Sequence, residues 1–397
     1  MNHKKVNRMY VLSFLFTLHI ALSAYVNSTF LSNIIPLNYV SILYTISSLV
    51  TLILLSKSSN LLKYFGNRKF SLWLLLANML SLVGMITSKN PYIVGTAFVV
   101  FVSTNTQILF CIDIFIEHFG DKETIGKNRG LYLTLVNLAW MLSPLIAAFL
   151  ITQEGGYKTI YTIAFVATVI MSFGMLLSVK NDYKDSSYKK TPFLETYRFL
   201  KTNHHMLAIT IISFILQFFY AWMIVYTPIY LYEHIGLGWT QIGIIFTIML
   251  APFVIFGLPI GILIDKYHVS KRVLLYIGFV IISVSTLIIS GITTKNILIW
   301  GIVLFMTRVG ATIIETTSEI YFFTHIKEEE TYLLSAFRDM NPVAYMIAPL
   351  ISTVIFLILP FNYLFLILGL ILLTGLYYIP HLKHNHECEN TLPNQNK

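Results

Sequence analysis

The residues of this sequence best able to do chemistry stand in one apolar stretch, residues 307–349. The two apolar ends of the stretch carry Arg308, Glu315, Glu319, Arg338 and Asp339. A charged side chain in hydrocarbon is costly unless it meets a partner or a water-filled cavity. On a helix, Arg308, Glu315 and Glu319 project from one face, because their spacings of seven and four residues are close to whole turns. We expect that face to point away from lipid.

Arg308 and Glu315 offer a specific chemistry. If the helix enters the membrane near Asn296, a rise of about 1.5 Å per residue places Arg308 roughly 18 Å deep, close to the midplane. Arg308 is therefore expected to bind an anionic or hydroxylated group, with Glu315 as its counter-ion or as a proton carrier. The alternative, a buried pair that only fixes packing, remains open.

The composition indicates that these charges lie within a membrane-spanning part of the protein. The chain has 397 residues, of which 56% are hydrophobic and 11% charged, with a mean hydropathy of +0.73. A soluble domain carries about 25% charged residues, so this is an all-α integral membrane protein. Twelve apolar runs approach the roughly 20 residues needed to cross a bilayer. They are residues 9–30, 37–56, 70–88, 92–117, 130–151, 158–179, 207–232, 239–264, 273–292, 296–323, 333–357 and 360–380.

The sequence also repeats itself over about half its length. The segment LAWMLSPLI at residues 138–146 matches VAYMIAPLI at 343–351, an offset of 205. Such a duplication is how many transporters are built, with the solute site between the halves. It predicts two pseudo-symmetric six-helix bundles, residues 1–180 and 207–380, a cytoplasmic linker at 181–206 and a cytoplasmic tail at 381–397. The solute is expected near the midplane, between spans 1, 4, 7 and 10.

The basic charge follows the predicted topology. Of 27 Lys and Arg residues, 22 fall in segments on the side of the N-terminus, and only Lys89, Lys158 and Lys295 fall in loops on the other side. This asymmetry predicts that both termini are cytoplasmic, in the plasma or inner membrane. The net charge of +9 is thus explained by the orientation of the chain in the membrane, and a nucleic-acid partner is not expected.

Polar and aromatic side chains inside the spans are candidates for a binding pocket, because small-solute pockets combine aromatic walls with a few polar tips. The candidates are His19, Tyr25 and Asn27 in span 1, Asn105 and Gln107 in span 4, and Gln217, Tyr220 and Trp222 in span 7. Two other interpretations stay open: small polar residues also pack helices together, and aromatic residues also gather at membrane interfaces. Tyr230 and Tyr232 are expected at the interface.

One loop carries a recognisable signature. Gly261, Asp265, Lys266, Lys271 and Arg272 lie between spans 8 and 9. This pattern resembles the Gly-x-x-x-Asp-Arg/Lys loop of the major facilitator superfamily, which that family carries after its second and eighth helices. The resemblance implies that Asp265, Lys271 and Arg272 help hold the cytoplasmic side closed. The earlier copy departs from the pattern, with Ser59 and Lys63 at the Gly and Asp positions.

Further charges mark the ends of spans 4, 5, 10 and 11: Asp113, Glu117, Arg129, Glu319 and Arg338. They resemble the Glu and Arg pattern of sugar-transporting members of the superfamily, where it forms inner-gate ion pairs. An ion pair of this kind adds little stability and serves as a latch. Solvated helix ends and direct solute contact are the alternatives.

Together these features predict a secondary-active transporter of a small organic solute, a symporter or uniporter working by alternating access, with membrane lipid around it and proton coupling left open. Span 5 lacks the glycines of the antiporter signature around Ser143 and Pro144, which disfavours drug/proton antiport. A non-transporting receptor or scaffold on the same fold is the alternative. An enzyme is not expected, since no His or Cys accompanies the carboxylate pairs. With only Cys111 and Cys388 and no zinc-type spacing, no metal or cofactor is expected.

Overall fold

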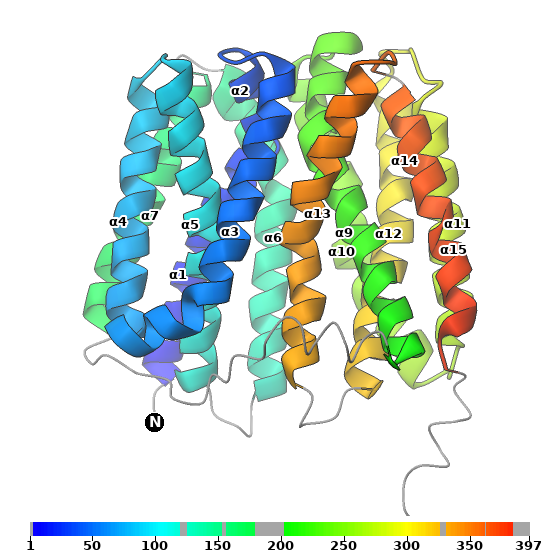
Figure 1. The fold of residues 1–397 in the computed structure, drawn as a ribbon, viewed down its shortest axis with the longest axis horizontal. Coiled ribbons are helices and arrows are strands. Elements are labelled where there is room, and N and C mark those ends of the chain that lie inside the picture. The colour runs from blue at the N-terminus through cyan, green and yellow to red at the C-terminus, as the bar shows by residue number, and fades with distance from the viewer. Residues whose placement is uncertain are drawn as a thin grey trace, which may run out of the picture. The chain divides into compact units, whose positions relative to one another are not determined.

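The computed structural model describes residues 3–119, 125–152, 156–178, 202–325, 331–361 and 363–383, and its described elements are all helical (Figure 1). The predicted linker and tail lie almost wholly outside these residues. The helices are α1 (His3–Ala24), α2 (Asn27–Ser32), α3 (Leu37–Phe65), α4 (Asn67–Thr87), α5 (Pro91–Phe119), α6 (Ile125–Thr152), α7 (Tyr157–Ser178), α9 (His204–Ile229), η2 (Tyr230–His234), α10 (Trp239–Asp265), α11 (Lys271–Ile289), α12 (Ile297–His325), α13 (Thr331–Phe356), α14 (Tyr363–Leu373), α15 (Gly375–Tyr378) and η4 (Ile379–His381).

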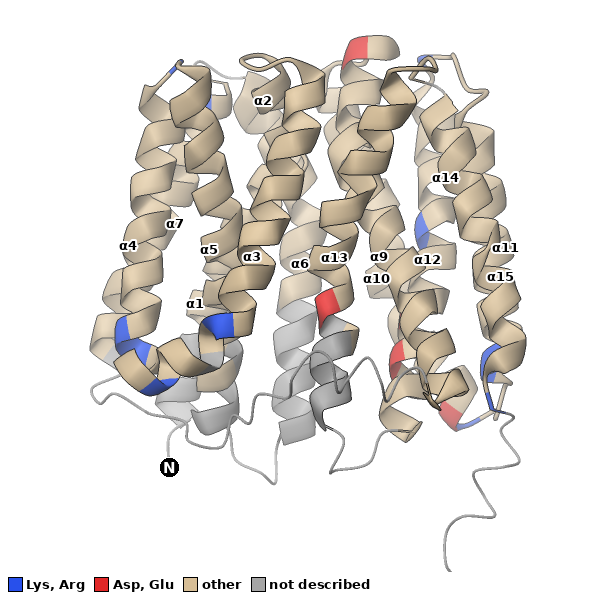
Figure 2. Cartoon of the chain, viewed as in Figure 1, with Lys and Arg blue, Asp and Glu red and all other residues tan. Residues whose placement is uncertain are grey.

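The helices have the length and composition of membrane spans. Within the described residues, ten are long and apolar enough to cross a bilayer, and α1 and α6 contain the shorter apolar segments Val11–Ala24 and Val136–Thr152. Every predicted span overlaps one of these helices. Figure 2 shows that the helices are uncharged along most of their length, as a hydrocarbon environment requires. The prediction of an all-α integral membrane protein is confirmed.

Three predicted spans are divided rather than continuous, and one of them, span 12, becomes α14, α15 and η4. Span 1 becomes α1 and α2, separated at Tyr25 and Val26. Ser23 Oγ donates to the Ile20 carbonyl and Thr29 Oγ1 to the Val26 carbonyl, at 2.9 and 3.0 Å. Such local bonds from hydroxyl side chains compete with the regular helical ladder. Span 7 likewise continues into the π-helical turn η2, which begins two residues after Pro228, a residue with no backbone N–H to donate.

Helix boundaries repeat at the sequence offset of 205. Shifted by that number, α4 falls within a few residues of α11, α5 of α12, and α6 of α13. The packing repeats as well: α4 packs on α5 and α7, and α11 packs on α12 and α14 (Figure 1). The duplication seen in nine residues of sequence therefore extends to the helices and their neighbours.

By contacts, the chain forms two compact units. The first, hereafter unit 1, comprises residues 1–190, 222–247 and 345–358, and unit 2 comprises 191–221, 248–344 and 359–397. Unit 1 has an apolar core of α1, α4, α5 and α7 that includes Phe16, Leu75, Phe115 and Met171. The bundle boundaries expected from the sequence remain a prediction.

In unit 2, two glycines set the approach of α11 and α12. A Cβ on Gly310 would lie 2.6 Å from the Ile282 nitrogen and 2.7 Å from the Gly278 oxygen, and one on Gly278 would lie 3.1 Å from the Gly310 oxygen. Small residues at such a crossing let two backbones touch, which is how helices associate without a hydrophobic driving force in lipid.

We therefore expect Gly310→Ala to destabilise the protein by about 1–3 kcal/mol, the usual cost of overpacking, since backbone atoms must move. Thermal unfolding in detergent would measure the change. Gly257→Ala in α10 is the matched control, because a Cβ there meets nothing within 4 Å and gains helix propensity. Equal unfolding temperatures for the two variants would contradict this account of the crossing.

Candidate functional site

Arg308 is the central residue of the site and belongs to unit 2. It lies twelve residues into α12, and only 1% of its surface is exposed. Its guanidinium carbon lies 4.9 Å from the centre of the Phe219 ring and 5.3 Å from that of Tyr220, both on α9. Guanidinium groups favour the faces of aromatic rings. Two neighbouring residues of α9 thus form an aromatic floor beneath the charge.

The floor leaves donors of Arg308 unused. Its Nε and Nη1 atoms are buried, and neither has a hydrogen-bond partner among the described residues. Guanidinium stays charged at any physiological pH and has five N–H donors but no acceptor. A buried cation with open donors is costly unless an anion or hydrogen-bond acceptor completes it. The arrangement is therefore suited to binding a negatively charged or oxygen-rich group.

Glu315 stands two turns further along α12 and is tied to the same aromatic residue. Its carboxylate accepts a hydrogen bond from the Tyr220 hydroxyl, with an oxygen–oxygen distance of 2.9 Å. Tyr220 thus contacts Arg308 through its ring and Glu315 through its hydroxyl. The hydrogen bond to Tyr220 is one that the sequence could not indicate, because the two residues are 95 positions apart.

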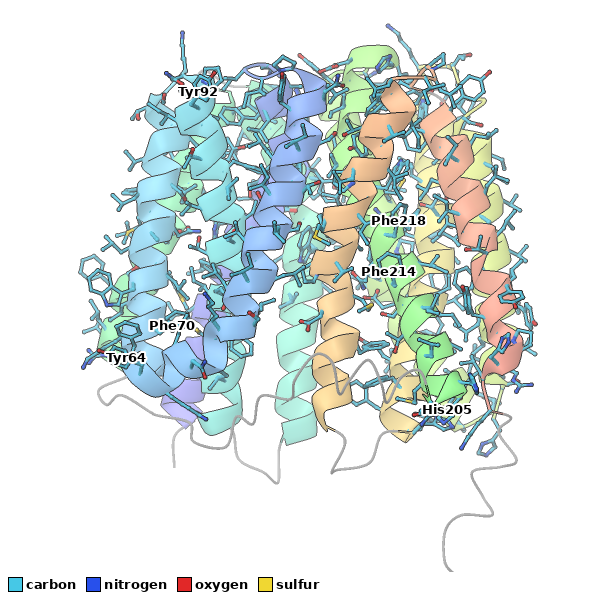
Figure 3. The ribbon with its side chains drawn as sticks, in the orientation of Figure 1. Tyr64, Phe70, Tyr92, His205, Phe214 and Phe218 are labelled. Carbon is cyan, nitrogen blue, oxygen red and sulfur yellow. The ribbon has the colours of Figure 1, made fainter. Side chains whose placement is uncertain are left out.

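A pair of amides lies on the same side of α9. Asn341 Nδ2, on α13, donates to Gln217 Oε1 at 2.7 Å. Gln217 is three residues before Tyr220, so the two share a face of α9. Figure 3 shows other aromatic side chains of this helix, Phe214 and Phe218, and His205 near its start. Asn341 was not among the predicted binding residues; its signal was an amide next to Pro342 within a span.

The remaining candidate binding residues belong to unit 1, where they are buried: His19, Tyr25, Asn27, Asn105, Gln107 and Trp222. His19 packs edge-on against Phe16, with ring centres 4.4 Å apart. Tyr25 packs on Phe246 at 5.0 Å, and Asn27 accepts a hydrogen bond from Tyr161 at 2.8 Å.

A hydrogen-bonded cluster of polar side chains in unit 1 is centred on Asn78. Asn78 Nδ2 donates to Thr104 Oγ1 and to Asn105 Oδ1, and its own Oδ1 accepts from Thr168. Gln107 accepts from Ser58 at 2.6 Å. Within unit 1, these hydrogen bonds join Asn105 and Gln107 to neighbouring helices. This is the arrangement expected if small polar residues pack the helices together.

The predicted gate residues are only partly described. The side chains of Asp113, Glu117, Arg129 and Arg338 lie outside the described residues. Asp265 and Glu319 are exposed, and Lys271 begins α11. The Arg272 guanidinium donates to the Leu382 carbonyl, so it contacts the segment after η4. The backbone N–H of Lys383 donates to the Tyr321 hydroxyl at 2.8 Å, which joins the same segment to α12. The gate role of these residues stays a prediction.

No metal site is apparent in the described part of the chain, where no three His, Cys, Asp or Glu side chains are grouped closely enough to hold an ion.

Comparison with known proteins identifies the family. The family model described as Major Facilitator Superfamily matches residues 9–337. The chain belongs to the major facilitator superfamily. The match covers the first half of the chain, most of the second half and the loop containing Gly261 and Asp265, on which the resemblance rested. The prediction of the family is thereby confirmed, and the protein is a membrane transporter by family.

Solved structures of superfamily transporters share the fold. The nucleoside transporter NupG matches with a TM-score of 0.76 and 11% identity, over 96% of this chain and 98% of the other. The human organic anion transporter MFSD10 matches with a TM-score of 0.67 and 10% identity, over 95% and 99% of the two chains. A bacterial metal transporter gives 0.66 and 14%, over 96% and 98%. No curated protein matches the sequence. Identities this low show the fold alone.

Proposed function

We propose that this superfamily member is a secondary-active transporter that moves a small organic anion across the cytoplasmic membrane by alternating access. The observation that carries the proposal is Arg308, a buried cation against two aromatic rings, with two donor nitrogens that have no partner among the described residues. A solute with a carboxylate or phosphate would supply the missing acceptors, because charge-assisted bonds to guanidinium are among the strongest in proteins.

The similar structures carry different solutes, nucleosides for NupG and organic anions for MFSD10. At identities of 11% and 10%, these structures do not indicate which solute this chain carries, so we infer the solute class from the residues of this chain. A permanent positive charge in the candidate site favours the anionic class, since an anion neutralises it and a neutral nucleoside does not.

We further propose that Glu315 binds a coupled proton. It is a carboxylate within a span, the kind of residue that proton relays in transporters use. Its partner Tyr220 suits both states of the group: a phenol hydroxyl donates to a carboxylate and accepts from a carboxylic acid. Proton release and binding at Glu315 would therefore leave neither group without a partner.

The remaining charges fit the same mechanism. The excess of Lys and Arg on the side of the N-terminus supports cytoplasmic termini. Asp113, Glu117, Arg129, Glu319 and Arg338 would form inner-gate ion pairs that break when the site opens to the cytoplasm. Asp265, Lys271 and Arg272 would help hold the closed state.

A ligand screen with two proteins tests the proposal. Purified protein and its Arg308→Ala variant would be heated with carboxylates, organic phosphates, sugars, nucleosides and lipophilic cations, and the unfolding temperature recorded. We expect stabilisation by members of the anionic classes only, lost in the variant, because a ligand stabilises the state that binds it. Uptake of the hit into proteoliposomes then separates a transporter from a receptor on the same fold. Stabilisation that survives Arg308→Ala, or binding without uptake, would contradict the proposal.

A further inference from the structure

The amide pair of Gln217 and Asn341 resembles a packing contact but is not completed like one. Each amide has one acceptor oxygen and two N–H donors. The bond between them uses the Gln217 oxygen and one donor of Asn341. Among the described residues, neither the Gln217 amide nitrogen nor the Asn341 side-chain oxygen has a further hydrogen-bond partner. Asn341 is exposed and Gln217 is half-buried.

Asn78 in unit 1 shows what a structural amide looks like in this chain. It is fully buried, with both its nitrogen and its oxygen bonded to side chains of other helices. That arrangement satisfies the amide without water or ligand, as buried polar groups require. The Gln217–Asn341 pair differs on both counts, since it is accessible and keeps a donor and an acceptor for another molecule.

The position of the pair in the membrane excludes a lipid-facing role. Gln217 lies thirteen residues after the start of α9 at His204, which is roughly 20 Å along the helix. This depth is inside a hydrocarbon core of about 30 Å. Accessible amides at such a depth must face water or solute, because hydrocarbon offers them no hydrogen bonds.

The pair also has a fixed relation to the charged site. Gln217 precedes Tyr220 by about one turn on the same face of α9, and the Tyr220 ring supports the Arg308 guanidinium. One turn of helix is about 5 Å. A solute whose anionic group is held at Arg308 would present an atom about 5 Å away to the amides.

We propose that Gln217 and Asn341 form a second contact for the transported solute and recognise a hydroxyl or amide about one helical turn from its anionic group. The remaining Gln217 N–H donates to the solute oxygen, and the Asn341 oxygen accepts from the solute O–H or N–H. The substrate class is then a hydroxylated or amide-bearing organic anion. This inference rests on the proposed function and deepens it, naming the solute class.

Two probes that differ in one group test the inference. 4-Hydroxybutyrate carries a hydroxyl about 5 Å from its carboxylate, and pentanoate replaces that hydroxyl with a methyl group at the same charge. Calorimetric titration of the full-length protein would give both dissociation constants. We expect 4-hydroxybutyrate to bind about tenfold more tightly than pentanoate. Its hydroxyl gains a hydrogen bond at the amides, whereas the methyl group of pentanoate leaves the amides without that partner.

In Asn341→Ala and Gln217→Leu, the preference for 4-hydroxybutyrate should fall to about one, while pentanoate binding changes by less than about threefold. Retained pentanoate binding shows that each variant is folded. Thr353→Val, on α13 with Asn341, is the matched control and should keep the preference, because in the described part of the chain its hydroxyl donates to the Pro349 carbonyl of its own helix.

The possible failures are distinct. Equal affinity of the two probes for the wild type, no binding of either probe, or a preference that persists in both amide variants would overturn the inference. The proposed anion site survives if the probes bind equally, or if the preference persists in the amide variants, provided that pentanoate binding still depends on Arg308. Binding of both probes to Arg308→Ala with unchanged affinity would instead overturn the proposed function.

Discussion

Replacing Arg308 with alanine is expected to weaken solute binding by about 10- to 100-fold and to reduce uptake to background. Bonds from a charged donor contribute about 1.5–3 kcal/mol, and the aromatic floor formed by Phe219 and Tyr220 cannot replace the lost charge. Calorimetry gives the change in dissociation constant, and proteoliposomes give the change in uptake.

Two further variants separate the effect of the guanidinium group from the effect of net charge. Arg308→Lys keeps the charge but loses the planar fork of donors, so we expect an intermediate affinity. Lys295→Ala removes a cation from an exposed position before α12 and should leave affinity unchanged. If Lys295→Ala weakens binding as much as Arg308→Ala, the effect is one of net charge, and the assignment of Arg308 fails.

The second large effect concerns Glu315. We expect Glu315→Gln to abolish accumulation of solute driven by a pH gradient while leaving exchange of solute for solute within about twofold. Glutamine still accepts a hydrogen bond from Tyr220 and so preserves the contact, but it cannot bind a proton. Uptake and counterflow in the same proteoliposomes measure the two activities.

Glu233 provides the control for this change. It lies in η2, and its side chain is exposed. Glu233→Gln removes the same charge outside the candidate site, and pH-driven accumulation should persist. Accumulation that is intact in Glu315→Gln, or lost equally in both variants, would show that Glu315 is not the proton-binding group.

Much of the fold could be predicted because a bilayer imposes simple rules. The apolar runs correspond to the helices, and the offset of 205 relates α4 to α11 and α5 to α12. The division of span 1 was missed, since hydropathy does not record that Ser23 and Thr29 bond to backbone carbonyls. Tyr230, expected at the interface, is buried and stacks on His234.

The site was predictable in its charges but not in its contacts. Arg308 and Glu315 were indicated because charge is rare and costly inside a span. Their link through Tyr220 depends on how α9 packs beside α12, which helical periodicity does not encode. The contact of Asn341 with Gln217 was not predicted for the same reason, because it joins residues 124 positions apart.

The most direct test of the central claim changes the solute rather than the protein. An anionic hit from the screen would be compared by calorimetry with its uncharged amide of nearly the same shape, using wild type and Arg308→Ala. We predict that the anion binds the wild type at least about tenfold more tightly than the amide, and that the difference disappears in the variant. Equal binding of the anion and its amide to the wild type would mean that Arg308 does not recognise the charge of the solute.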